Sequence, residues 1–165
     1  MRSRQIAVAM LVFAFASLAR AEQVMFMFGL DPSQEVQNPP VVSPGSGLGH
    51  VTYDTDTNVI EWDISFQNLV AAVSVAHFHG PAAVGANASP ILGVATTPVT
   101  SGVLQGSADW AQANEAALLD GLVYFNIHTS TFPGGEIRGQ VVPEPATLAV
   151  LLIGAVAMLR RRRRA

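Results

Sequence analysis

Histidine is concentrated in two short, strand-like stretches of this chain. His77 and His79 stand two residues apart in the first stretch, and His128 lies in the second. Side chains at positions i and i+2 of a strand point to the same side, so His77 and His79 present two imidazoles together. A third imidazole from a nearby strand would complete a set suited to copper or zinc. The spacing therefore predicts a candidate metal site formed by these three residues.

Alternation of apolar and polar residues predicts the strands that would position these histidines. The clearest run covers residues 60–66, and turn-forming residues at 54–58 join it to a second alternating run at 51–54. Further strands are expected at residues 24–30, 73–79, 121–128 and 136–142. One helix is expected at residues 108–119, with Ser107 or Asp109 as its cap and Gly121 just past its end. Proline-rich residues 38–45 are expected to form an extended loop. The pattern indicates an all-β sandwich or barrel.

The N-terminus has the features of a signal peptide. Arg2 and Arg4 precede an apolar run at residues 6–18, and Ala19-Arg20-Ala21 supplies the small-x-small pattern that signal peptidase accepts. An apolar membrane anchor is the alternative, but the run is short for a span. We therefore expect residues 1–21 to be removed and the mature chain to start at Glu22.

The C-terminus contains three features in a fixed order. Pro143, Glu144 and Pro145 are followed by an apolar stretch at residues 146–159 and by five arginines at 160–164. As a helix the stretch would be about 21 Å long, which is short of the roughly 30 Å hydrocarbon core of a bilayer. The arginines should hold the end in the cytoplasm.

This order of features resembles the PEP-CTERM sorting tail of Gram-negative bacteria. The resemblance implies transient anchoring in the inner membrane by a short transmembrane helix, cleavage by an exosortase, and delivery to the envelope or extracellular matrix. Residues 143–165 are assigned to this tail. An ordinary C-terminal membrane anchor is the alternative.

Removal of both ends leaves an acidic domain at residues 22–142. Arg138 is its only lysine or arginine, against eleven carboxylates, so its net charge is about −10. Such a surface would repel nucleic acid and anionic lipid. The chain has no cysteine and no lysine, which excludes disulfides, thiolate metal sites and Schiff-base chemistry.

Five motifs in this domain are similar to those of the chordin-type (CHRD) domain family. They are Gln34-Glu35-Val36, Gly45-Ser46-Gly47, Ala76-His77-Phe78-His79-Gly80-Pro81, Gly121-Leu122-Val123-Tyr124-Phe125-Asn126-Ile127-His128-Thr129 and Pro133-Gly134-Gly135-Glu136-Ile137-Arg138-Gly139-Gln140. The resemblance implies a compact immunoglobulin-like β fold in extracellular proteins, without a settled biochemical activity.

The preferred functional hypothesis is a non-enzymatic binding or structural module. It would be displayed in the envelope or exopolysaccharide matrix, bind an extracellular protein or glycan through its loops, and need no cofactor. Signal peptidase and an exosortase would be its processing partners.

The alternative is a copper-binding domain with superoxide dismutase-like activity. The histidine pattern is similar to the copper half of copper/zinc superoxide dismutases, which are sandwiches with a His-x-His strand, a later strand histidine and an arginine. By that analogy His77, His79 and His128 would hold copper, and Arg138 would guide the anionic substrate. The expected fold is thus an immunoglobulin-like or superoxide-dismutase-like β-sandwich with one short helix, flanked by the signal segment and a C-terminal hydrophobic helix.

A purely structural role for the same residues is the remaining interpretation. The three histidines, Glu136 and Arg138 would form a polar network that pins two strands, with Glu136 or another carboxylate neutralising Arg138. Val73 and Val75 share the face of His77 if the strand is regular, which would bury that face.

Overall fold

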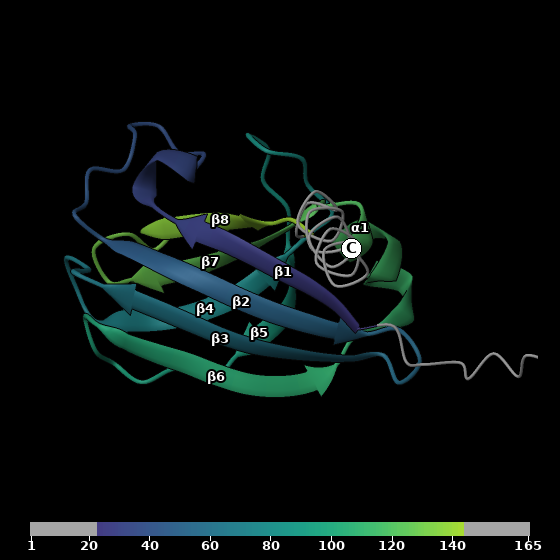
Figure 1. The fold of residues 1–165 in the computed structure, drawn as a ribbon. Helices are drawn as coiled ribbons and strands as arrows, with labels where there is room; N and C mark the ends of the chain where they lie inside the picture. The colour runs from purple at the N-terminus through teal and green to yellow at the C-terminus, as the bar shows by residue number, and fades with distance from the viewer. Residues whose placement is uncertain (1–22, 144–165) are drawn as a thin grey trace, which may run out of the picture.

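Eight strands in two antiparallel sheets make up the computed structural model, which describes residues 23–143 (Figure 1). One sheet has the order β1-β2-β3-β6 and the other β5-β4-β7-β8. The strands are β1 (Gln23–Leu30), β2 (Ser46–Asp54), β3 (Val59–Gln67), β4 (Val73–His79), β5 (Pro90–Val94), β6 (Gly102–Asp109), β7 (Val123–Thr129) and β8 (Ile137–Val141). Two 3-10 turns, η1 (Pro32–Gln34) and η2 (Gln112–Asn114), and one helix, α1 (Glu115–Leu119), complete the described part.

The predicted signal segment and nearly all of the predicted sorting tail lie outside the described residues. Within residues 23–143, no helix has the length and apolar character needed to cross a membrane.

The core lies between the two sheets and follows from the period-two pattern of the strands. In β3, positions 60, 62, 64 and 66 are buried while the intervening positions are exposed. They meet the inward side chains of the other sheet, among them Phe78 and Phe125. Burial of this apolar surface is the main stabilising contribution in a domain without cysteine.

The two sheets come together along one side through β1 and β8. Asp31 and Arg138 exchange backbone hydrogen bonds of 3.1 and 3.2 Å, and Phe26 forms an isolated bridge with Pro143. Gly139 permits this approach, because a Cβ atom there would lie 2.6 Å from Gly29 O. The end of the domain is therefore joined to its first strand.

The all-β prediction is confirmed, and the six predicted strands are present. Five of them shift by at most two residues at either end, whereas β2 begins at Ser46, well before the predicted run at 51–54. Residues 38–45 lie outside the strands, as the proline content predicted. Gly121 follows α1 with a φ of 70°, a backbone conformation suited to glycine at a helix end.

The helix prediction was wrong at its start. Ala108 and Asp109 pair with Ile60 and Val59 in β6, so α1 begins only at Glu115. The backbone hydrogen bonds between β6 and β3 outweigh the helix propensity of a short alanine-containing stretch, because tertiary pairing overrides a weak local preference.

Strands β5 and β6 were not predicted. β5 contains Pro90 and Gly93, which mark turns in a sequence, and β6 is rich in small residues. In β6, Gly106 lies opposite Trp62, and a Cβ there would lie 2.6 Å from the indole ring. A glycine that weakens the strand signal is thus needed to accommodate the indole.

We predict that Gly139→Ala lowers the free energy of unfolding by about 1–3 kcal/mol. The added methyl group would lie 2.6 Å from Gly29 O and 2.7 Å from Phe28 Cδ2, so β8 would be pushed away from β1. Urea denaturation of the purified protein measures the change. Gly29→Ala is the matched control, because nothing lies within 4 Å of its added methyl group. Equal losses in the two variants would contradict the role of this close approach.

Candidate metal centre

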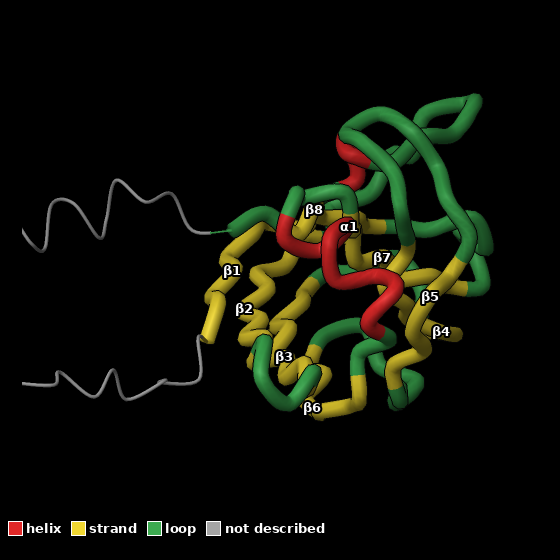
Figure 2. The backbone as a smooth tube through the Cα atoms, turned by 90° about the vertical axis from the view of Figure 1, so that its right-hand side faces the viewer, coloured by secondary structure: helices red, strands yellow, loops and turns green. Residues whose placement is uncertain are grey.

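The three histidines lie on the outer face of the β5-β4-β7-β8 sheet. β4 and β7 pair antiparallel, with His77 opposite Asn126, His79 opposite Tyr124 and His128 opposite Val75. Loop segments cover this face on the side away from the other sheet (Figure 2). The pairing thus places the His-x-His segment and the later histidine on adjacent strands.

An irregularity in β4 separates Val73 from the histidine face. The register with β7 shifts between Val73 and Val75, and Val73 is buried in the core. Val75 remains on the outer side and is 36% exposed. The expectation that both valines share the face of His77 was therefore wrong for Val73, because the shift breaks the alternation.

The three imidazoles converge on one point. One ring nitrogen from each of His77, His79 and His128 lies within 4.8 Å of the others. The ring centroids are 5.4 Å apart for His77 and His79, 5.3 Å for His77 and His128, and 5.7 Å for His79 and His128. One ion could lie between the three rings if the nitrogens draw in to metal–nitrogen distances of about 2 Å.

Two backbone carbonyls orient two of the rings. His79 Nδ1 lies 3.0 Å from Ala88 O, and His128 Nδ1 lies 3.0 Å from Pro133 O. A carbonyl oxygen only accepts, so each Nδ1 carries the proton and each Nε2 keeps its lone pair. This is the outer-shell arrangement that orients metal-bound histidines.

The remaining nitrogens are buried without a partner. His79 Nε2, His128 Nε2 and His77 Nδ1 make no hydrogen bond and are shielded from solvent. Burial of an unpaired polar atom is costly, and such atoms in a folded protein need an explanation. A bound metal ion would satisfy all three at once.

The imidazoles favour the neutral, ligand-ready form. Burial lowers the pKa of His77, His79 and His128 below the ordinary value of 6.5. For His79 and His128 the carbonyl hydrogen bonds oppose this effect, and neighbouring imidazoles add to it. Neutral imidazole is the form that binds metal.

His77 lies at the accessible side of the cluster. It is partly exposed, whereas His79 and His128 are 6% and 8% exposed. Gly93 of the edge strand β5 pairs with His77, and a Cβ at Gly93 would come no closer than 4.0 Å to the imidazole. An ion can therefore approach from the side of β5.

Arg138 is held beneath the loops beside this cluster. It is 1% exposed, and its guanidinium donates to Asn87 Oδ1 at 3.1 Å, Ala86 O at 2.9 Å and Gln140 Oε1 at 3.5 Å. Its guanidinium carbon lies 3.4 Å from the centroid of the Tyr124 ring. The side chain thus ties the loop at residues 80–89 to β8.

Tyr124 connects Arg138 with the histidines. Its ring stacks on His79 with centroids 4.8 Å apart and planes 9° apart. Its hydroxyl donates to Ala88 O at 3.2 Å, the same carbonyl that His79 Nδ1 contacts. The cation–π contact and the stacked ring therefore brace the imidazole of His79.

Glu136 is fully buried, and its carboxylate binds neither Arg138 nor the histidines. Its carboxylate accepts from Ser43 Oγ at 2.6 Å, Val70 N at 2.6 Å and Thr129 Oγ1 at 2.7 Å. These bonds join the loop before β2, the segment after β3 and the end of β7. Glu136 fastens three segments around the end of the sheet that carries His128.

Glu35 is the carboxylate that interacts electrostatically with Arg138. Burial raises its pKa to about 7, against the opposing effects of Gln37, Arg138 and Asn126. Its Oε2 is 3.4 Å from Gln37 Nε2 and 3.5 Å from Asn126 Nδ2. The sequence marked Glu35 only as part of a family motif, because nothing local indicates that its loop folds over the sheet.

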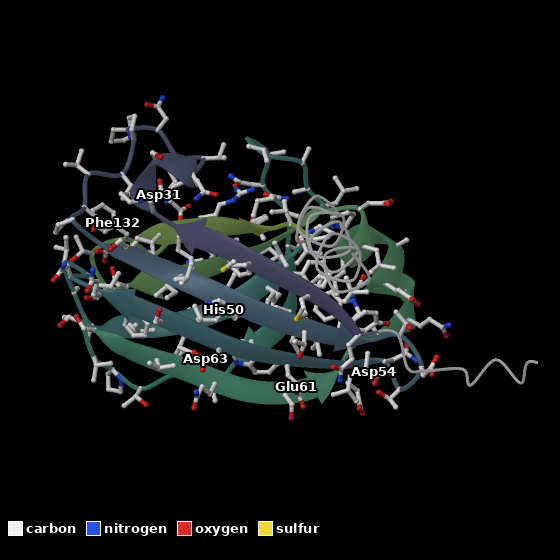
Figure 3. The ribbon with its side chains drawn as sticks, in the orientation of Figure 1. Asp31, His50, Asp54, Glu61, Asp63 and Phe132 are labelled. Atoms are coloured by element: carbon white, nitrogen blue, oxygen red, sulfur yellow. The ribbon has the colours of Figure 1, made fainter. Side chains whose placement is uncertain are left out.

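Asn126 and Tyr124 could be placed beside His128 from the alternation of β7 alone. The partners of these three side chains could not, since Ala88 beside Tyr124, Glu35 beside Asn126 and Pro133 beside His128 all lie outside the strands. The fourth histidine, His50, is exposed on the opposite sheet (Figure 3).

We predict that Glu35→Gln stabilises the metal-free protein more at pH 8 than at pH 5. The folded-state pKa of about 7 lies above the ordinary 4.5, so the folded form retains the proton more strongly. The stabilising contribution of protonated Glu35 is complete below about pH 4.5 and is lost as the pH rises through 7. Glutamine resembles the protonated form and does not ionise, so the variant keeps this stabilising contribution as the pH rises. Urea denaturation across this range measures the difference.

The control is Glu61→Gln, at an exposed carboxylate of β3 on the opposite sheet (Figure 3). The change in the effect of the substitution between pH 5 and pH 8 should be larger for Glu35→Gln than for this control. Equal changes in the two variants would contradict the prediction.

Two family models together match nearly all of the described residues and the C-terminal tail. The model of the CHRD domain matches residues 26–141, and the model of the PEP-CTERM protein-sorting motif matches residues 141–164. Neither the curated proteins nor the solved structures contain a match. The sorting motif implies processing by an exosortase and export to the cell envelope or extracellular space. The chain belongs to the CHRD domain family and carries a C-terminal PEP-CTERM sorting motif.

Proposed function

We propose that this protein is an exported, non-enzymatic module that binds one copper or zinc ion through His77, His79 and His128. The observation that carries the proposal is the convergence, within 4.8 Å, of three imidazoles whose buried free nitrogens have no partner. Imidazole is a suitable ligand for both metals. The ion would join β4 to β7 and so stabilise the folded state by mass action.

The metal-free network is the competing interpretation, and the hydrogen bonds argue against it. In such a network the imidazole nitrogens would be paired with protein groups, as Glu136 and Arg138 are. Each of the three histidines instead leaves one buried nitrogen unpaired. The carbonyls of Ala88 and Pro133 accept hydrogen bonds only from the Nδ1 atoms of His79 and His128.

The superoxide dismutase-like alternative is not favoured. It needs a cation that attracts the anionic substrate, and Arg138 is 1% exposed with its guanidinium directed to Asn87, Ala86 and Tyr124. Apart from this residue, residues 23–143 contain no lysine or arginine.

The sorting motif supports a proposal for delivery. Residues 1–21 would direct export, and the tail at 143–165 would hold the chain in the inner membrane of a Gram-negative bacterium until exosortase cleavage. The sandwich is complete at Val141, which is fully buried, and Pro143 adds only a bridge to Phe26. Cleavage within or after the Pro-Glu-Pro motif would therefore release an intact domain.

We predict that the purified protein binds one equivalent of copper(II) or zinc(II). His77→Ala with His79→Ala removes two of three ligands, so the affinity should fall by more than about 100-fold. His128→Ala should weaken binding in the same direction. Metal content after loading and dialysis, together with calorimetric titration, measures the effect.

His50→Ala is the matched control, because this histidine is exposed on the opposite sheet. It should bind metal with unchanged affinity and stoichiometry. The proposal would be contradicted by a protein that stays metal-free after loading with both ions. Equal losses of metal affinity in the control and the double variant would also contradict it.

A further inference from the structure

The two methionines of the described domain lie close together on the outer face of the β1-β2-β3-β6 sheet. Met25 and Met27 are two residues apart in β1, so their side chains point to the same side. They are 56% and 41% exposed, although methionine is usually buried. Residues 23–143 contain no other sulfur atom. Both thioethers of the described chain are therefore available in one area of the surface.

A histidine lies beside this pair on the neighbouring strand. His50 of β2 pairs directly with Met27, and Met25 is its diagonal neighbour. The Cβ atoms of directly opposite residues are about 4.5–5.5 Å apart, and long side chains also reach diagonal neighbours. All three side chains are exposed, and methionine is unbranched and flexible. The register thus allows two thioether sulfurs and one imidazole to reach a common point.

The charge around His50 favours a cation. Asp63 of β3 lies opposite His50, and Glu61 lies on the same face two residues before Asp63 (Figure 3). Asp63 Oδ2 accepts from Gln105 Nε2 at 2.6 Å, which holds this carboxylate on the face. Arg138, the only lysine or arginine in residues 23–143, is buried in the other sheet. A positive ion at His50 would therefore meet negative charge and no competing cationic side chain.

An apolar docking surface is the competing interpretation of the exposed methionines. Leu48 and Val103 are exposed on the same face. Ser65 lies between these two residues in the row that crosses the sheet, and Asp63 lies in the row of Met27. Polar and charged side chains therefore break up the apolar surface, which is unlike the continuous patch of a docking site.

We propose that Met25, Met27 and His50 form a second metal site, which is selective for copper(I). Thioether sulfur is a soft, uncharged ligand suited to copper(I). One histidine with two thioethers is a weak set for zinc(II), which is held by thiolate, imidazole and carboxylate ligands. The site lies on the other sheet from the three clustered histidines and does not rest on the proposed function. His50→Ala consequently remains a control for loading with copper(II) or zinc(II).

Titration of the full-length protein with copper(I), without oxygen and in competition with a coloured chelator, measures the affinity. X-ray absorption of the bound copper reports whether sulfur is a ligand. Met25→Leu with Met27→Leu keeps two apolar side chains of similar volume and removes both sulfur atoms. The variant should lose the copper–sulfur scattering and bind copper(I) at this site more than about 100-fold more weakly. His50→Ala should weaken binding in the same direction.

The same measurements on His77→Ala with His79→Ala isolate the second site, because this variant lacks two ligands of the other one. It should still bind one copper(I) through sulfur, and adding the two methionine substitutions should abolish that binding. Met158→Leu makes the same chemical change in the C-terminal tail and should leave affinity and sulfur scattering unchanged.

The inference would be overturned if the His77→Ala, His79→Ala protein bound no copper(I), or bound it without sulfur scattering. Equal copper(I) affinities in that background for the methionine variant and the Met158→Leu control would also overturn it. A protein that binds copper(I) through sulfur but neither copper(II) nor zinc(II) would support this inference and contradict the proposed function.

Discussion

The register between β4 and β7 is the constraint on which the candidate site depends. With His77 opposite Asn126 and His79 opposite Tyr124, three imidazoles from two strands share one small area of the outer face. A slip of one residue would turn the histidines of one strand into the core and apolar side chains outward. The apolar inner faces of both strands oppose that slip, so the hydrophobic core and the candidate metal centre are specified by the same pairing.

The domain buries its only arginine, while carboxylates such as Asp56, Glu61 and Asp63 are exposed. Arg138 is buried against Tyr124 and bound to the loop at residues 80–89. Its backbone also bridges to Asp31, where the two sheets meet. Glu136 joins a further three segments. In a chain without disulfides, Arg138 fastens the loop at residues 80–89 and Glu136 fastens three segments at the end of the sheet. The hydrogen bonds of both residues offset part of the cost of burial.

Prediction from sequence worked best for strands with a regular alternation. Residues 60–66 alternate between apolar and polar side chains, and they form β3. It failed for β5, where Pro90 and Gly93 resemble a turn signal, and for β6, where Gly106 accommodates the Trp62 indole. It also failed for the start of α1, because pairing with β3 recruits Ala108 and Asp109 into a strand.

The sequence by itself determined the all-β class, the histidine set and the shared face of His77 and His79, because these depend on the local two-residue period of a strand. Only the tertiary structure decided that His128 lies beside them and that Ala88 and Pro133 orient two rings. It also decided that Val73 turns into the core and that Glu35 reaches Asn126 from a loop 91 residues away in the chain. Contacts between distant segments depend on the path of loops and on register. The local sequence pattern specifies neither of them.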